Sequence, residues 1–365
     1  MNALFEELLA RARHAFHAMH ALPGAPGAAP PASGPAAEAP GADDPLLAAA
    51  RRHRVVGLLR AGGDARCAGE SWRVAAYGQA LHSARCAAEA ARVFAALDAA
   101  AGPALLVKGP ALAAQAWPDP GLRAFDDLDF RCPSDAFPAV CSTLGREGYR
   151  PELDDERRRS HYWHFGWGMA FVHPDGFRVE VNHRFFPPQY PWPRRLPSGV
   201  GAAPLALDGA VVRAPSPALH LLLSCHHALW HGGERLAWIA DIAGLLARHP
   251  EAFVLARAVA PGFARRALLA GVGLADSLFG PESVHARPPV SAAERLFLEQ
   301  LRRDRGVNDA ERRWLHRSLL STFERARYAA RRAGTPGDGD FRRLRLPPAL
   351  RPLYWLYRPL RLARR

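Results

Sequence analysis

The sequence is poor in lysine, in cysteine and in long apolar runs. Lys108 is the only lysine, and the five cysteines are odd in number and show no Cys-x-x-Cys spacing. This cysteine usage is typical of a reducing cytoplasm and argues against a disulfide scaffold or a zinc ribbon. No uninterrupted apolar run reaches the roughly 18–20 residues that a membrane-spanning helix needs. Hydrophobic residues still make up 49% of the chain, too many for a disordered protein.

Arginine supplies nearly all of the positive charge. The 365 residues carry a net charge of +13, and the last 25 residues contribute +8 of it, with eight arginines and no acidic residue. We expect this tail, residues 341–365, to pack on the body of the protein. The alternative is contact with an anionic membrane surface, which would make a cytoplasmic protein peripheral to the membrane. Nucleic acid is disfavoured as a partner because no recognised nucleic-acid motif accompanies the tail.

Composition divides the chain into six segments. We expect an N-terminal helix at 1–21, a linker rich in Pro, Ala and Gly at 22–44, and a helical segment at 45–102. An α/β core at 103–200, a helical domain at 201–340 and the basic tail follow. The first helix would then be an appendage to a body that starts near Pro45. The pattern predicts the α+β class, with helical segments on both sides of a small core.

Within the core, short apolar and alternating runs predict strands. Residues 104–107 are apolar and end at Lys108-Gly109, residues 126–130 alternate polar and apolar, and residues 168–186 read as two strands around a Pro-Asp-Gly turn. Residues 110–117 and 133–148 fit helices, the first with proline at its opening position.

Two aspartates on the second predicted strand carry most of the chemical information. Residues two apart on a strand share a face, so Asp127 and Asp129 should project together while Leu128 and Phe130 face a core. Carboxylates held side by side repel each other unless a cation is present. Mg²⁺ meets this need, since it takes a few carboxylate oxygens and leaves positions for substrate phosphates. Two such ions can stabilise both ends of a phosphoryl or nucleotidyl transfer.

A third carboxylate is expected from a neighbouring strand. In residues 177–184, Val179 and Val181 should face the core, which places Glu180 on the opposite face. Glu180 would act either as a third metal ligand or as the base that orients a nucleophile.

These residues, in this order, resemble a known superfamily. The run LLVKGPALAAQAWPDPGLRAFDDLDF, then a helix, Gly148-Tyr149 and VEVNH, is similar to the polymerase-beta-type nucleotidyltransferases. The closest likeness is to a bacterial family of uncharacterised nucleotidyltransferases marked by Lys-Gly, by Arg-x-x-x-Asp-[Ile/Leu]-Asp and by Glu-x-x-His. The resemblance covers roughly residues 45–250.

The resemblance implies a mixed sheet with an NTP and Mg²⁺, or Mn²⁺, bound beside it. Asp127 and Asp129 would be metal ligands and Glu180 the third carboxylate. Lys108 would contact the triphosphate or pair with a site carboxylate, and Gly109 would let the backbone approach a phosphate. Arg123 would bind the triphosphate, or would instead clamp Asp127 or Asp129.

Further polar groups lie outside this pattern. His227 and His231 are spaced for zinc, but no His-Glu-x-x-His pattern and no second cysteine accompany them, so we expect histidines in a helix packed on the core. Asp241 would either reach the site or hold a helix contact. Residues 161–164 follow three arginines, which favours a solvated basic turn over a loop above the nucleotide.

The expected activity is Mg²⁺-dependent transfer of a nucleoside monophosphate from an NTP to an acceptor hydroxyl or phosphate. Three acceptor classes stay open: a peptide natural product, a protein that receives AMP, and a polysaccharide precursor. The alternative is a non-catalytic nucleotide-binding or scaffold protein that docks through its basic tail.

Overall fold

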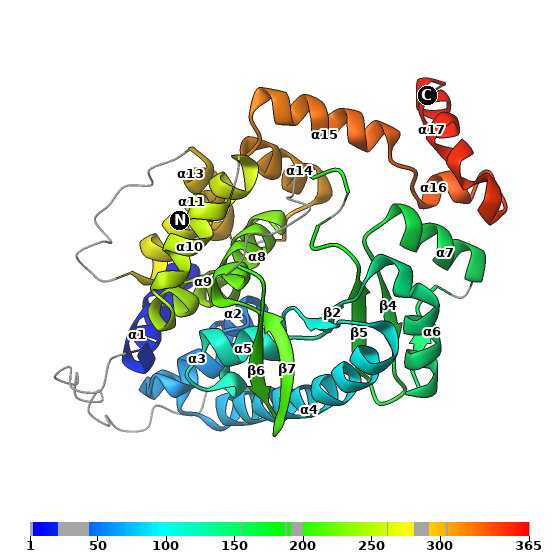
Figure 1. The fold of residues 1–365 in the computed structure, drawn as a ribbon. Coiled ribbons are helices and arrows are strands. Elements are labelled where there is room, and N and C mark those ends of the chain that lie inside the picture. The colour runs from blue at the N-terminus through cyan, green and yellow to red at the C-terminus, as the bar shows by residue number, and fades with distance from the viewer. Residues whose placement is uncertain are drawn as a thin grey trace.

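A small mixed sheet lies between helical segments, which confirms the predicted α+β class (Figure 1). The computed structural model describes residues 3–20, 44–153, 155–186, 188–190, 200–260, 262–280, 292–303 and 306–364. The segment predicted as a linker lies outside these residues, apart from Asp44. That residue caps the helix α2 (Pro45–His53) with its side chain.

Five short strands form the sheet in the order β1-β2-β5-β4-β3. Only β2 and β5 run parallel, and every other neighbouring pair is antiparallel. The strands are β1 (Leu105–Leu106), β2 (Leu128–Arg131), β3 (Arg150–Pro151), β4 (Gly168–Val172) and β5 (Arg178–Asn182). The turn between β4 and β5 is the predicted Pro-Asp-Gly turn, so this hairpin prediction is confirmed.

One face of the sheet is buried against helices. Leu128, Phe130, Val179 and Val181 are almost fully buried, in one cluster with side chains of α4 (Glu70–Ala101) and α6 (Phe137–Arg146). The alternation predicted for β2 and β5 is therefore confirmed. Because side chains alternate across a strand, the intervening polar residues of both strands lie on the other face.

The remaining helices surround this unit. The helix α8 (Pro217–Trp230) has a favourable start, because Ser216 accepts a hydrogen bond from the Leu219 N–H and Pro217 occupies the first position. The others are α1 (Ala3–His20), α3 (Val56–Ala61), α5 (Pro110–Ala116), α7 (Glu156–Phe165), α9 (Leu236–Arg248), α10 (Glu251–Val259), α11 (Gly262–Phe279), α13 (Ala292–Arg302), α14 (Asp309–Ser318), α15 (Thr322–Gly334), α16 (Asp338–Phe341) and α17 (Tyr354–Ala363), with 3-10 turns η1 (Ala65–Cys67), η2 (Pro120–Leu122), η3 (Ser134–Ala136) and η4 (Pro348–Leu353).

The first helix is part of the core and not an appendage. Phe5, Leu8, Leu9 and Phe16 of α1 are buried in the same cluster as side chains of α8, α9 and α11. The apolar pattern of the segment 1–21 predicted a helix correctly. The helices against which it packs lie far along the chain, and the prediction that it is an appendage is wrong.

The segment predicted as helical from residue 201 begins with a β-hairpin. β6 (Ala202–Leu207) and β7 (Ala210–Pro215) pair around Asp208-Gly209. Both residues have positive φ, at 48° and 76°, as a two-residue hairpin turn requires. The predicted helical domain has its first helix at Pro217, and the hairpin before it was not predicted.

The basic tail packs on the body. α16, η4 and α17 lie beside α7, and α15 leads to them across the molecule (Figure 1). Residues 161–164 belong to α7, where His161 and Trp163 are buried, so the prediction of a solvated turn is wrong. Among the described helices, none combines the length and the apolar character needed to cross a bilayer.

Candidate functional site

The three predicted carboxylates gather at one place on the polar face of the sheet. Asp129 of β2 lies directly opposite Glu180 of β5 in the parallel register. Asp127 immediately precedes β2 and, two residues from Asp129, shares its face. All three residues line one cavity of about 350 Å³. The side chain of Asp129 is buried, whereas those of Asp127 and Glu180 are partly exposed to the cavity.

Two basic side chains contact this group and offset part of its negative charge. Lys108 Nζ lies 3.5 Å from Asp129 Oδ1. Arg178 Nη1 lies 2.5 Å from Glu180 Oε1 and 3.5 Å from Asp127 Oδ2, and its Nε donates to Glu152 at 2.7 Å. The sequence prediction that Lys108 pairs with a site carboxylate matches this contact.

Burial and neighbouring charges shift the pKa values of this group. Burial raises the pKa of Asp127 above its usual value, and the charge of Asp129 adds to this effect. Burial also raises the pKa of Asp129, against the influence of Lys108 and together with that of Glu180. Burial disfavours the Lys108 ammonium, but the three carboxylates outweigh this and raise its pKa. Carboxyl groups in this state gain from a further cation.

Gly109 is required by the geometry of this corner. Its φ of 56° and ψ of −120° belong to a region that glycine adopts readily and other residues avoid. A Cβ at this position would lie 3.1 Å from the carbonyl oxygen of Asp127. Gly109 therefore lets the chain after β1 pass close to the backbone just before β2.

Arg123 and Asp241 form an ion pair with each other. Arg123 Nε and Nη2 donate to the two carboxylate oxygens of Asp241 at 2.7 and 2.8 Å, and both side chains are buried. Trp117 Nε1 donates to Asp241 Oδ1 at 2.7 Å. The alternative that Arg123 clamps Asp127 or Asp129 is not seen. The third nitrogen, Nη1, is buried without a hydrogen-bond partner among the described residues, and Arg123 lines the cavity.

Arg131 also lines the cavity and was not among the predicted site residues. Arg131 is two residues beyond Asp129 on the same face of β2, opposite Asn182 of β5. Its guanidinium lies 4.8 Å from the ring centroid of Phe185, and its Nε is buried with no hydrogen-bond partner in the described part of the chain. Burial lowers its pKa. The alternation that revealed Asp127 and Asp129 continues to residue 131, so the signal was present.

The far wall of the cavity is rich in aromatic and histidine rings. His227 of α8 and His231, the residue that follows the helix, lie with ring centroids 4.5 Å apart, each about 5.0 Å from the ring of Trp238 on α9. Burial lowers the pKa of His231 to about 3 and that of His227 well below its usual value, so both are neutral at pH 7. The prediction of histidines in a helix packed on the core is confirmed. Other residues of the wall are Leu223, His226, Trp230 and Arg235.

No preassembled cluster of three or more His, Cys, Asp or Glu side chains that could hold a metal ion occurs in the described residues. This is consistent with Glu180 being turned to Arg178. Asp127 and Asp129 remain as an adjacent pair. Mg²⁺ is commonly bound through one or two carboxylates together with substrate phosphates, so the chemistry of this donor pair fits that ion.

The chain matches a protein-family model. A family model described as an uncharacterised nucleotidyltransferase matches residues 40–280, which include every residue of the site described above. No curated protein and no solved structure matches the chain.

Proposed function

The chain belongs to this family of uncharacterised nucleotidyltransferases, and from that premise we propose that it transfers a nucleoside monophosphate from an NTP to an acceptor hydroxyl or phosphate with the help of Mg²⁺. One observation carries the proposal. Asp127, Asp129 and Glu180 meet on the cavity face of a parallel strand pair, beside the only lysine of the chain.

Asp127 and Asp129 are the proposed metal ligands, and Mn²⁺ would suit them as well. The bound ion would neutralise charge on the phosphates and orient the triphosphate for in-line displacement. Besides burial, the charge of Asp129 raises the pKa of Asp127, and both residues line the same cavity. Glu180 is proposed as the third carboxylate, completing the site or accepting the proton of the acceptor hydroxyl.

Lys108, Gly109 and Arg123 are the proposed contacts of the triphosphate. Lys108 places a cation next to Asp129, and Gly109 keeps the adjacent backbone free of a side chain. Arg123 combines two functions in this proposal. Asp241 fixes two of its nitrogens, while the unpartnered Nη1 is available to a phosphate oxygen in the cavity.

The rate enhancement would come from positioning and charge stabilisation. Phosphoryl and nucleotidyl transfers need little covalent chemistry from the protein, since the metal and cationic side chains stabilise the charge that develops on the phosphates. The neutral wall of His227, His231 and Trp238 offers rings on which a nucleobase or another planar group can stack.

A pyrophosphate-release assay tests the proposal. The full chain is incubated with Mg²⁺, each of the common NTPs in turn, and a metabolite extract as the source of acceptor. We expect release with at least one NTP, and a loss of at least about tenfold in Asp127→Asn and Asp129→Asn, because weakening even the surroundings of metal ligands costs 10–100-fold.

Asp175→Asn is the matched control, because Asp175 lies on the exposed turn between β4 and β5, outside the cavity. Release that is absent in the wild type, or equal in all three variants, contradicts the proposal. NTP binding without release in the same preparation would favour the alternative, a non-catalytic nucleotide-binding or scaffold protein.

A further inference from the structure

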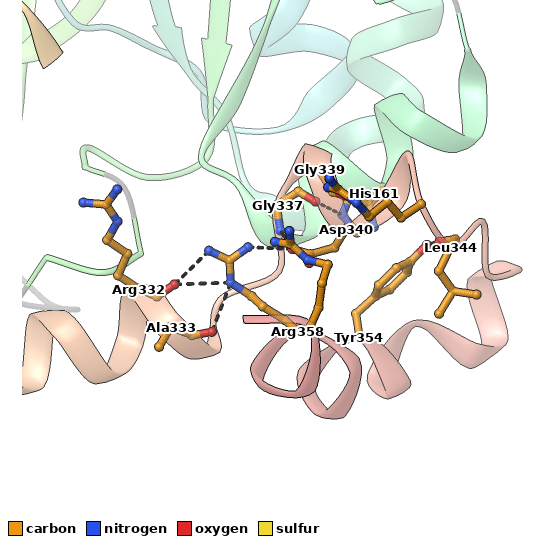
Figure 2. Close-up of polar contacts among 11 residues, drawn as sticks. His161, Arg332, Ala333, Gly337, Gly339, Asp340, Leu344, Tyr354 and Arg358 are labelled. Atoms are coloured by element: carbon orange, nitrogen blue, oxygen red, sulfur yellow. Dashed lines mark hydrogen bonds and ion pairs between the residues drawn. The ribbon is translucent and has the colours of Figure 1, made fainter. Parts of the chain in front are cut away.

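The inner side of the C-terminal helix α17 is polar and firmly held. Tyr354 is fully buried, and Arg358 and Arg361 follow it at helical spacing on the same side. Arg358 Nη1 and Arg361 Nε each lie 2.6 Å from a different carboxylate oxygen of Asp340, which has no exposed surface. Figure 2 shows Arg358 reaching from α17 to this aspartate. The charged residues of α17 therefore point into the protein.

Further hydrogen bonds fix the rotation of the helix about its axis. Tyr354 Oη donates to the carbonyl oxygen of Leu344 and accepts from the Leu346 N–H. Arg358 also donates to the carbonyl oxygens of Arg332 and its neighbour at the end of α15 (Figure 2). Turning α17 to bury its other side would break these bonds together with the ion pairs to Asp340.

The outer side of the same helix is apolar. Leu353, Leu356 and Leu360 recur at helical spacing and are 45%, 67% and 61% exposed. Trp355 and Leu350 beside them are about half exposed. An ordinary surface helix turns its leucines inward and its arginines outward, and α17 does the reverse. A contiguous apolar patch of this kind marks an interaction site.

Positive charge borders the patch. Arg343, Arg345 and Arg364 are exposed, and residues 341–365 contain no acidic residue. Asp338 and Asp340, which precede this stretch, are each engaged by arginines, and Arg345 Nη1 lies 4.0 Å from Asp155 Oδ2. The surface is therefore leucine- and tryptophan-rich with a basic rim, which is the composition of helices that lie in the headgroup region of a membrane.

We propose that the outer face of α17 binds the surface of an anionic lipid bilayer. Leucine side chains are stabilised when they leave water for the acyl-chain region of a bilayer, whereas a phosphate backbone offers them no such stabilisation. The exposed leucines therefore favour lipid over nucleic acid as the partner. The basic rim would repel the same rim on a second copy of the chain, which disfavours self-association through this face. The proposal is independent of the transferase chemistry.

Vesicle sedimentation of the full chain tests the proposal. We expect binding to vesicles of phosphatidylcholine mixed with phosphatidylglycerol, much weaker binding to phosphatidylcholine alone, and weakening by salt. Binding that does not distinguish the two vesicles, or no binding to either, overturns the proposal.

The apolar face is tested by Leu356→Gln with Leu360→Gln. Glutamine keeps helix propensity, and both positions are exposed, so the variant should fold, as a thermal melt of the variant would verify. We expect a loss of vesicle affinity of at least about tenfold. The matched control is Val74→Gln with Val254→Gln, because both valines are exposed on helices remote from the tail, α4 and α10. Equal affinity of the two double variants overturns the proposal.

The basic rim is tested by changing Arg343, Arg345 and Arg364 to glutamine. Each arginine near an anionic surface raises the membrane affinity by a factor of roughly five, so the triple variant should bind the vesicles about a hundredfold more weakly. The control changes three exposed arginines elsewhere, Arg51, Arg257 and Arg265, with the same loss of net charge. An equal loss of vesicle affinity in the two triple variants overturns the proposal. A dimer of the wild type that Leu356→Gln with Leu360→Gln dissociates would also overturn it. So would RNA binding by the wild type that this double variant retains.

Discussion

At Gly109 the backbone conformation and the packing both demand a residue without a side chain. Its φ is positive, and an added Cβ would lie 3.1 Å from the carbonyl oxygen of Asp127, the residue just before β2. Lys108, on one side of this residue, contacts Asp129. A single glycine therefore brings the lone lysine and the paired aspartates together.

Gly109→Ala should destabilise the fold by about 1–3 kcal/mol, because alanine is strained in this conformation and its Cβ would press on Asp127. Urea denaturation measures the change. Gly78→Ala is the control: Gly78 lies inside α4 with open space around it, so alanine should stabilise the protein by about 0.5–1 kcal/mol. A loss of stability as large in Gly78→Ala would contradict this account of Gly109.

At the scale of elements, buried ion pairs join segments that are distant in the sequence. Asp241 on α9 binds Arg123 just before β2 and Trp117 just after α5. Asp340 in α16 binds two arginines of α17. Asp241 fixes Arg123 at the wall of the cavity, and Asp340 fixes the orientation of the tail.

Asp241→Ala should cost about 3–5 kcal/mol of unfolding free energy, since removing one partner leaves the buried Arg123 guanidinium uncompensated. Chemical denaturation followed by circular dichroism measures this cost. Glu70→Ala, which removes an exposed ion pair with Arg73 on α4, should change stability by less than about 1 kcal/mol. Similar losses in both variants would show that Arg123 is well solvated and would refute the buried-pair assignment.

The anchoring of α17 should weaken in acid. Burial alone would raise the pKa of Asp340, but the Gly337 N–H and the guanidinium groups of Arg358 and Arg361 lower it below its usual value. A carboxyl group with a lowered pKa stabilises the fold fully above its unfolded pKa of about 4, and this stabilisation is lost as pH falls through the folded pKa.

Hydrogen-exchange protection of the α17 amides should therefore be constant near neutral pH and should fall below about pH 4. Asp340→Asn should show low protection throughout, without the acid step. A wild-type acid step that persists in Asp340→Asn would assign it to another group, such as Asp338, whose pKa Arg158 also lowers.

For the whole molecule, α1 links the start of the chain to the helices that follow the sheet. Leu8 has no exposed surface and belongs to the core that includes α8, α9 and α11. Leu8→Ala should cost about 2–5 kcal/mol by urea denaturation. The control Leu81→Ala, at a half-exposed position on α4, should cost less than about 0.5 kcal/mol. A small effect at both positions would return α1 to the status of an appendage.

Local patterns predicted much of this fold, because strand faces depend on residues two apart. The buried Leu128, Phe130, Val179 and Val181 and the polar face opposite them follow from alternation alone. The β6–β7 hairpin was missed although Asp208-Gly209 is a hairpin signal. The Arg123–Asp241 pair joins residues 118 positions apart. No local pattern encodes such a contact, and the same holds for α1 in the core and for α7 beneath the tail.

Binding of a divalent ion and an NTP at Asp127 and Asp129 is the central claim, and Mn²⁺ tests it most directly. The enhancement of water proton relaxation by Mn²⁺ bound to the full chain, with and without a non-hydrolysable NTP, reports the ternary complex without requiring the acceptor. We predict an enhancement that depends on the NTP, that Asp129→Asn abolishes and that the control Asp175→Asn preserves. An enhancement that is absent in the wild type, or that survives Asp129→Asn unchanged, would contradict the account.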